Sequence, residues 1–192
     1  MTFETPLLRG RDASLMRQGA LVVAGSLLIA IAAQVSVPMW PVPITLQTLA
    51  ILTVGLSLGA RLGAATLGLY LMEGAMGLPV FANGGAGLAY MAGPTGGFLI
   101  GFALMAFVAG LGSRFGFLGM AVAAAAASVL LYVPGLAWPY AVASGFGIDA
   151  GWASTAAGKL WAGWMQPFLI GDAIKAVIAA LIVSGGRKAL AR

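Results

Sequence analysis

Two residues of opposite charge interrupt an apolar stretch near the C-terminal end of the sequence. In FLIGDAIKAVIAALIV, residues 168–183, Asp172 precedes Lys175 by three positions, which places both on one face of a helix. A charge in the hydrocarbon of a membrane costs at least about 2.5–3.5 kcal/mol, so such residues are candidates for a functional site. A carboxylate beside an ammonium could bind a ligand that carries an N–H group and a carboxylate. The alternative is an internal ion pair that serves only the fold.

A second polar group lies in VPMWPVPITLQT, residues 37–48. Its three prolines stop one helix and delay the next. Gln47 offers an amide donor and an amide acceptor to a ligand. Thr45 and Thr48 fit the N-terminal cap of the following helix.

The glycine-rich segment FANGGAGLAYMAGPTGG, residues 81–97, contributes the third group. Glycines let backbone approach a ligand and let a segment move as a lid. Asn83 and Tyr90 are its polar side chains, and Phe81 would form an apolar wall. Glu73, in the preceding apolar run, fits either a water-filled cavity or a membrane interface that its side chain reaches by extending.

Composition decides what kind of protein must position these residues. Of the 192 residues, 61% are hydrophobic and only 8% are charged, and the mean hydropathy is +1.01. Soluble domains are about a quarter charged, so the sequence predicts an integral membrane protein. Cysteine and histidine are absent, which removes thiol and imidazole catalysis and most metal sites. We therefore expect no catalytic residue, no metal and no cofactor.

Apolar runs long enough to cross a membrane predict an all-α protein with six transmembrane helices. They occupy residues 18–36, 44–60, 62–78, 97–113, 117–134 and 167–185. A cytoplasmic N-terminus puts eight of the ten basic residues inside, as the positive-inside rule requires. Both termini are then cytoplasmic, and the scattered charges favour membrane orientation over nucleic-acid binding. A cleaved signal peptide over residues 1–33 is disfavoured because its apolar run is long and leads into another span.

The chain is predicted to be one transmembrane domain over residues 1–192. Residues 1–17 form a cytoplasmic segment, and residues 79–96 form an outer, lid-like loop. Residues 135–166 hold Trp138, Trp152, Trp161 and Trp164, which favours short helices along the outer membrane interface. No nucleotide-binding motif is present, so any use of ATP must come from a partner chain. In the first helix, Ala20 and Ala24 form a small-xxx-small motif, two small residues four positions apart that let another helix pack closely.

Several motifs together resemble one known family. VPITLQT, YLMEGAMGLPVFANGGAG, GPTGGFLIGF and PFLIGDAIKA are similar to the BioY family, the biotin-specific substrate-binding (S) components of energy-coupling factor (ECF) transporters. The resemblance covers residues 20–185. It implies a high-affinity, non-enzymatic subunit in a prokaryotic cytoplasmic membrane that captures biotin at the outer face. It also implies a transmembrane T-component and two cytoplasmic ATPases as partners, which would dock on the small-xxx-small motif of Ala20 and Ala24. Because some members of the family lack these partners, action alone or as a homo-oligomer stays open.

The same resemblance assigns site residues. Asp172 and Lys175 fall on the family's D-x-x-K pattern and would be polar ligands of biotin. Asn83 would offer its amide to the ureido ring, and Gln47 and Tyr90 are further candidates. Some relatives place an arginine near the ligand carboxylate, but residues 79–96 contain no basic residue, so Lys159 is the candidate replacement.

Three other functions compete with biotin binding. An S-component for another small carboxylated vitamin would fit the same donors and acceptors. An intramembrane hydrolase using Asp172 and Glu73 is disfavoured by the missing histidine, cysteine and metal cluster. A structural membrane subunit would use Asp172 and Lys175 only as an internal pair.

Overall fold

The structure is a computed structural model, and it describes residues 15–145 and 150–190. Only the last three residues of the expected cytoplasmic segment 1–17 belong to the described part. The basic residues Arg9, Arg11 and Arg192, which contributed to the predicted orientation, lie outside it.

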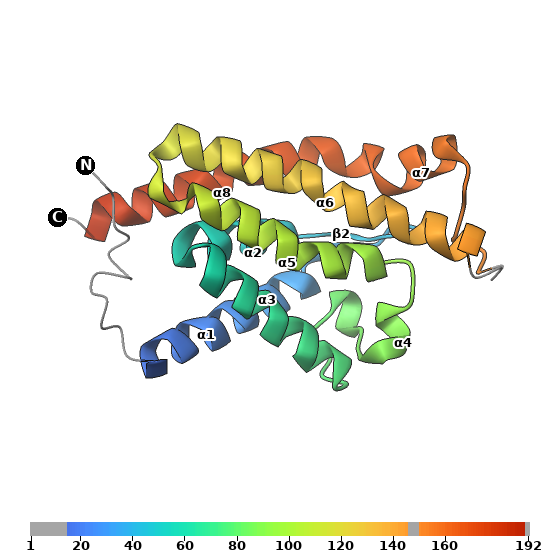
Figure 1. Ribbon diagram of the computed structural model, residues 1–192, viewed down its shortest axis with the longest axis horizontal. Coiled ribbons are helices and arrows are strands. Elements are labelled where there is room, and N and C mark those ends of the chain that lie inside the picture. The colour runs from blue at the N-terminus through green and yellow to red at the C-terminus, as the bar shows by residue number, and fades with distance from the viewer. Residues whose placement is uncertain (1–14, 146–149, 191–192) are drawn as a thin grey trace.

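The N-terminal half contains three helices and a short hairpin (Figure 1). Helix α1 (Leu15–Gln34) leads into the antiparallel strands β1 (Ser36–Val37) and β2 (Ile44–Thr45), in which Ser36 pairs with Thr45. The prolines between the strands keep this segment out of a helix. Helices α2 (Gln47–Leu58) and α3 (Ala60–Ala75) then meet at Gly59. Gly59 adopts φ +84°, a conformation that residues with side chains rarely take.

The C-terminal half contains three further long helices and the segments that join them. The glycine-rich segment forms two short elements, η2 (Ala82–Gly84) and α4 (Gly87–Met91). The chain continues through α5 (Gly96–Leu111), η3 (Gly112–Arg114) and α6 (Phe117–Gly145). It ends in α7 (Ala157–Trp164), η4 (Gln166–Phe168) and α8 (Leu169–Leu190).

Each of the six expected apolar runs therefore contains a helix, although not all are long. Within the described residues, four segments are long and apolar enough to cross a membrane. These are Leu15–Gln34, Gly96–Arg114, Phe117–Gly145 and Ala157–Leu190. Helix α2 has only 12 residues and α3 has 16. Six membrane crossings and the sides of the termini remain predictions.

Helix α6 differs most from its expected end. We expected the span to stop at residue 134, yet the helix continues through Pro134 and Pro139 to Gly145. Packing explains the continuation, because α6 lies close against α5 at this point. A Cβ atom placed on Gly97 of α5 would lie 2.3 Å from the carbonyl oxygen of Pro134. Neighbouring helices can thus hold a proline-containing helix together in a membrane protein.

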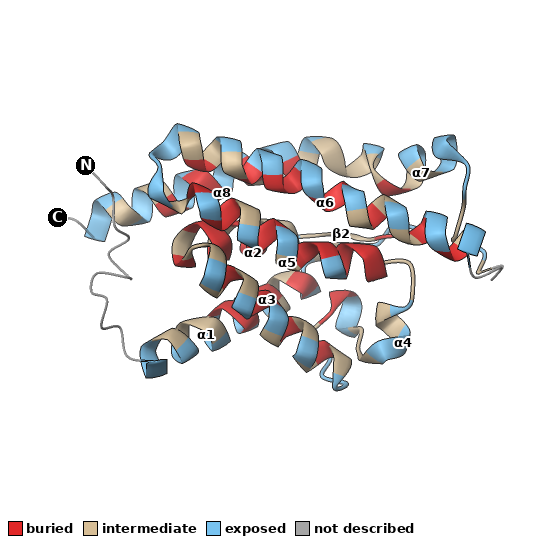
Figure 2. Ribbon diagram, viewed as in Figure 1, coloured by how far each residue is buried: buried red, intermediate tan, exposed pale blue. Residues whose placement is uncertain are grey.

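Helix α5 is the centre of the bundle and packs against α2, α3 and α6. Its contact with α2 is a close backbone approach, since a Cβ atom on Gly55 would lie 2.5 Å from the carbonyl oxygen of Ala106. Figure 2 shows buried residues concentrated on α5 and on the faces turned toward it. The outer faces of α1 and α8 remain apolar and exposed, with Ile31 67% and Ile174 54% accessible. Exposed apolar helix faces are typical of a protein surrounded by lipid.

Candidate ligand-binding site

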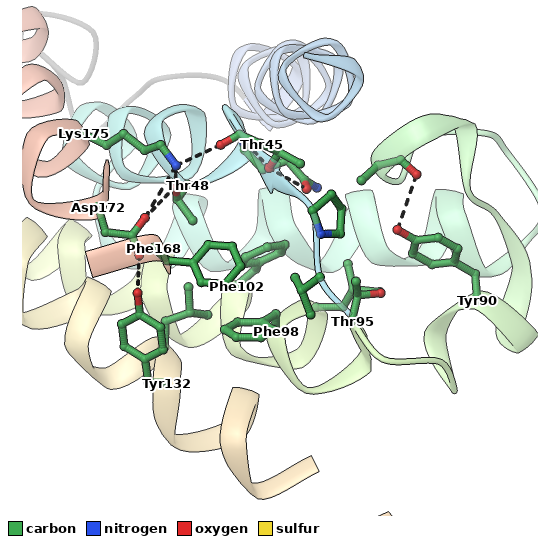
Figure 3. A pocket seen from close by; sticks show the side chains of 16 residues that line it. Thr45, Thr48, Tyr90, Thr95, Phe98, Phe102, Tyr132, Phe168, Asp172 and Lys175 are labelled. Carbon is green, nitrogen blue, oxygen red and sulfur yellow. Dashed lines mark hydrogen bonds and ion pairs between the residues drawn. The ribbon is translucent and has the colours of Figure 1, made fainter. Parts of the chain in front are cut away.

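A cavity lies between α5, α6 and α8 and is closed by the segments around residues 42–48 and 82–95 (Figure 3). Its volume is about 50 Å³, and one water needs roughly 10–15 Å³ on this scale. The walls are mainly aromatic and aliphatic: Phe98, Leu99, Phe102, Leu131 and Phe168. The cavity holds only a few waters in this conformation, so a vitamin-sized ligand requires its walls to move apart.

Asp172 is the centre of a polar cluster on one side of the cavity. Its Oδ2 accepts a hydrogen bond from the Tyr132 hydroxyl at 2.6 Å, and its Oδ1 accepts one from the Thr48 hydroxyl at 3.3 Å. The Nζ of Lys175 lies 3.6 Å from Oδ1. Asp172 is 6% exposed, so donors from three helices compensate a buried carboxylate.

Lys175 links the start of α2 to α8. Its Nζ donates to the backbone carbonyl of Thr45 at 2.9 Å and to the Thr48 hydroxyl at 3.0 Å. Thr48 therefore accepts from Lys175 and donates to Asp172. Figure 3 shows Lys175, Asp172, Thr48 and Tyr132 grouped on one side of the cavity. The cluster presents a cationic donor and an anionic acceptor side by side.

Gln47 also lines the cavity, but its amide already has protein partners. Its Nε2 donates to the Tyr70 hydroxyl at 2.7 Å, and its Oε1 accepts from the Thr45 hydroxyl at 3.0 Å. Tyr70 in turn donates to the carbonyl of Val80 at 2.9 Å. This chain of hydrogen bonds fixes the start of α2 to α3 and to the beginning of the glycine-rich segment.

Tyr90 closes the cavity from the opposite side, as Figure 3 shows. Its hydroxyl donates to the carbonyl of Ala82 at 3.4 Å, and its ring stacks on Phe81 with centroids 5.3 Å apart. Phe81 lies over Gly74, where a Cβ atom would come within 2.0 Å of the ring. Burial raises the pKa of Tyr90, so the phenol stays neutral and can donate a hydrogen bond near neutral pH.

Two of the predicted site residues do not line this cavity. Phe81 is fully buried and supports the ring of Tyr90 from behind. Asn83 has φ 57°, and its Oδ1 accepts a hydrogen bond from the Ser36 hydroxyl at 2.6 Å. Its amide is thus used to hold the glycine-rich segment to β1. Their contact with a ligand remains a prediction that requires this segment to move.

Glu73 and Lys159 are also outside the cavity lining. Glu73 accepts a short hydrogen bond from the buried Ser26 hydroxyl, which joins α3 to α1. Lys159 is exposed on α7. Glu73 therefore makes an interhelical hydrogen bond, as polar residues inside membrane helix bundles commonly do.

Tyr132 was not predicted from the sequence as a site residue, and Thr48 was assigned to a helix cap. Leu46 occupies the N-cap position of α2 and makes no capping hydrogen bond. The Thr48 hydroxyl binds Asp172 and Lys175 instead, so the capping interpretation of Thr48 is wrong. Thr45 does accept a hydrogen bond from the Gln47 backbone at 3.2 Å, which is a capping contact. A signal for Tyr132 existed, because it is one of only two polar side chains in the apolar run 117–134.

A sequence profile described as the BioY family matches residues 5–192 of this chain. The chain belongs to the BioY family. A BioY protein of Rhizobium etli called "Biotin transporter BioY" is 38% identical over 168 residues, which cover 85% of this chain and 85% of that protein. "Probable biotin transporter BioY" of Pyrococcus horikoshii is 43% identical over 105 residues, which cover 55% of this chain and 61% of that relative. The second match thus spans less than two thirds of the relative's length.

A solved structure has the same fold as this BioY-family chain. It is a crystal structure described as the S-component for biotin from an ECF-type ABC transporter. The TM-score is 0.75 at 24% sequence identity, and the match covers 93% of this chain and 95% of the other. The expected likeness to the S-component fold is confirmed.

Proposed function

We propose that this chain is the biotin-binding subunit of a vitamin uptake transporter and that it has no catalytic role. The observation that carries the proposal is the polar cluster of Asp172 and Lys175 beside aromatic walls in one closable cavity. Biotin combines a polar ureido ring, an apolar bicyclic body and a charged chain, and ligand sites match such molecules with few polar groups in an apolar pocket. The names of the relatives support the same ligand.

The spacing of the charges favours one orientation of biotin. Asp172 and Lys175 lie 3.6 Å apart, so they address the same end of an elongated ligand. A ureido ring carries a carbonyl acceptor next to N–H donors, which complements the Lys175 ammonium and the Asp172 carboxylate. A ligand carboxylate at this point would meet the like charge of Asp172. We infer that the ureido ring binds the cluster, which replaces the expected contact of Lys175 with the carboxylate.

Entry of biotin requires the cover of the cavity to move. The cover consists of residues 79–96. Its hydrogen bonds to the rest of the fold include Ser36 to Asn83, Gln34 to Phe81 and to Gly84, Tyr70 to Val80, and Trp138 to Gly93. Opening would break several of these hydrogen bonds, which contacts with biotin must replace, whereas the hydrogen bond from Tyr90 to Ala82 lies within the cover and can persist. In the open state the Asn83 amide could turn to the ligand. We propose that residues 79–96 are a lid.

The energising partners are proposed to be a T-component and two ATPases, as in ECF-type transporters. The face of α1 supports a docking role, because Ala20 and Ala24 are both exposed. Leu27 and Ile31 continue this exposed face and are 57% and 67% accessible. Small residues on such a face let a partner helix approach closely. Placement in the cytoplasmic membrane with six spans and both termini inside belongs to the same proposal.

Ligand-dependent stabilisation of the purified protein tests the proposal. Biotin at 100 times its dissociation constant should add about 2.7 kcal/mol to the free energy of unfolding. We expect a raised thermal midpoint with biotin and none with other carboxylated vitamins, measured in detergent. A shift with a different vitamin would identify another S-component substrate. No shift with any vitamin in a folded sample would favour a structural role for Asp172 and Lys175.

The proposed orientation of biotin can be tested by comparing biotin with biotin amide, which lacks the negative charge of the carboxylate. Lys175→Ala should weaken binding of biotin and of biotin amide by the same factor, about 10-fold or more, because a hydrogen bond to a charged group is lost. Isothermal titration calorimetry with both ligands measures this factor. If Lys175 instead binds the carboxylate, the substitution will penalise biotin and spare the amide. Lys188→Ala, exposed near the end of α8 and outside the cavity lining, serves as the matched control and should change neither affinity.

A further inference from the structure

A second hollow is lined by residues where α2 meets α3 and where α5 meets α6. These two connections lie at the end of the bundle opposite α4 (Figure 1). It is an open groove of about 530 Å³. Residues 58–62 form one wall, and Phe107, Leu111, Ser113 and Arg114 form another. The groove shares no lining residue with the proposed biotin cavity, so it requires its own explanation.

The groove is positively charged and has donors without acceptors. Arg61 and Arg114 both line it and both are exposed, and neither makes a hydrogen bond or ion pair within the residues that the structure describes. No carboxylate is among its lining residues in that part of the chain. Helix α3 starts in the groove at Ala60 without a side-chain cap. Its first amide groups therefore lack intrahelical acceptors and favour an anion.

Arg187 shows that the basic residues at this end differ in their use. Its guanidinium donates to the carbonyl of Ser113 at 2.6 Å and to the carbonyl of Leu56 at 2.8 Å. These bonds satisfy carbonyls near the ends of α5 and α2 and hold α8 to both helices. The Arg187 guanidinium thus already binds two backbone carbonyls, whereas those of Arg61 and Arg114 are available to a ligand.

An apolar stripe runs from the groove along α5. Leu104, Phe107 and Leu111 are spaced by three and four residues, which places them on one helix face. They are 43%, 41% and 49% exposed, although most of α5 is buried. A free phosphate ion or an acidic peptide would not bury these apolar side chains. A lipid would lay an acyl chain along it while its headgroup meets the arginines.

We propose that this groove binds the headgroup of an anionic phospholipid. The phosphate lies between Arg61 and Arg114, beside the N-terminal end of α3, whose dipole favours an anion. One acyl chain follows Leu104, Phe107 and Leu111 along α5. Basic pockets between helices at a membrane surface are suited to such headgroups. The bound lipid joins α3 to the α5–α6 connection at the end of the bundle where α1 begins and α8 ends.

The test uses the full-length protein in nanodiscs or mixed micelles with phosphatidylglycerol or phosphatidylcholine. We expect phosphatidylglycerol to raise the thermal midpoint, and native mass spectrometry to find it bound to the protein. Each arginine near an anionic surface contributes roughly fivefold in affinity, so Arg61→Gln with Arg114→Gln should weaken phosphatidylglycerol binding about 30-fold. Lys188→Gln is the matched control, since Lys188 is basic and exposed at the same end but does not line the groove.

Several outcomes would overturn the proposal. Equal stabilisation by phosphatidylcholine, or an equal loss with Lys188→Gln, would mean that no specific headgroup site exists. Equal stabilisation by inorganic phosphate would assign the groove to a soluble anion. Loss of association with a protein partner, without a change in lipid binding, would assign the arginines to protein docking. The double variant should keep the unfolding midpoint of the unsubstituted protein in neutral detergent, which separates lost binding from misfolding.

Discussion

Asp172→Asn should weaken biotin binding by about 30-fold to 1,000-fold, because truncating one member of a buried, hydrogen-bonded charge pair costs at least about 2 kcal/mol. The asparagine keeps the shape of the side chain but removes the charge that faces Lys175 at 3.6 Å. It also replaces an oxygen acceptor with a donor, so that one of the hydrogen bonds from Tyr132, Thr48 or the ligand must be lost. Calorimetric titration with biotin measures the effect directly.

Glu73→Gln provides the comparison for the Asp172 variant. Glu73 is the other carboxylate in the described part of the chain, and it contacts Ser26 rather than the cavity. We expect its amide variant to bind biotin with nearly unchanged affinity. If both variants lose affinity equally, the effect arises from the stability of the bundle and not from contact with biotin. Tyr132→Phe should give an intermediate loss, since it removes one donor and leaves the carboxylate in place.

Gly55→Val is expected to destabilise the protein by about 3 kcal/mol, the upper end of the usual cost of overpacking. A Cβ atom at this position would lie 2.5 Å from the backbone oxygen of Ala106, and backbone cannot turn aside as a flexible side chain can. Helices α2 and α5 must then separate, and α2 carries Gln47 and Thr48 into the cavity. The thermal midpoint in detergent should fall by several degrees, with weaker biotin binding.

Gly68→Ala is the matched control for this substitution. Gly68 lies in α3, and no atom comes within 4 Å of the position that a Cβ atom would take there. Alanine is also favoured over glycine in a helix by about 1 kcal/mol. The thermal midpoint of this variant should equal or exceed that of the unsubstituted protein. Equal losses for both glycine variants would contradict a specific close contact between α2 and α5.

The sequence predicts the location of the helices and of the polar cluster for clear physical reasons. Long apolar runs leave few alternatives to helices in a membrane. Two charged residues within one such run stand out because placing a charge in hydrocarbon costs free energy. Asp172 and Lys175 could therefore be singled out before any contact was known. The expected order of the long helices is present in the structure.

Other parts of the site depend on contacts that sequence spacing does not encode. Tyr132 lies 40 positions before Asp172 and donates to it only because α6 packs against α8. The orientation of Asn83 depends on Ser36, which is 47 positions away. The end of α6 was placed too early because the rule that proline ends a helix neglects the packing of α5 against Pro134. In each case a tertiary contact overrides or adds to the local pattern.

The short length of α2 has a consequence for how the bundle fills the depth of the membrane. At 1.5 Å per residue, the 12 residues of α2 extend about 18 Å, whereas the hydrocarbon layer is about 30 Å thick. Every residue of α2 is buried or half-buried, so the helix is enclosed by its neighbours and does not set the thickness of the surrounding lipid. Non-helical backbone at membrane depth is tolerated only where protein encloses it or where it lines a cavity. The hairpin before α2 meets this condition, because its Thr45 carbonyl accepts a hydrogen bond from Lys175. A polar vitamin that displaces this contact would meet protein backbone in place of hydrocarbon.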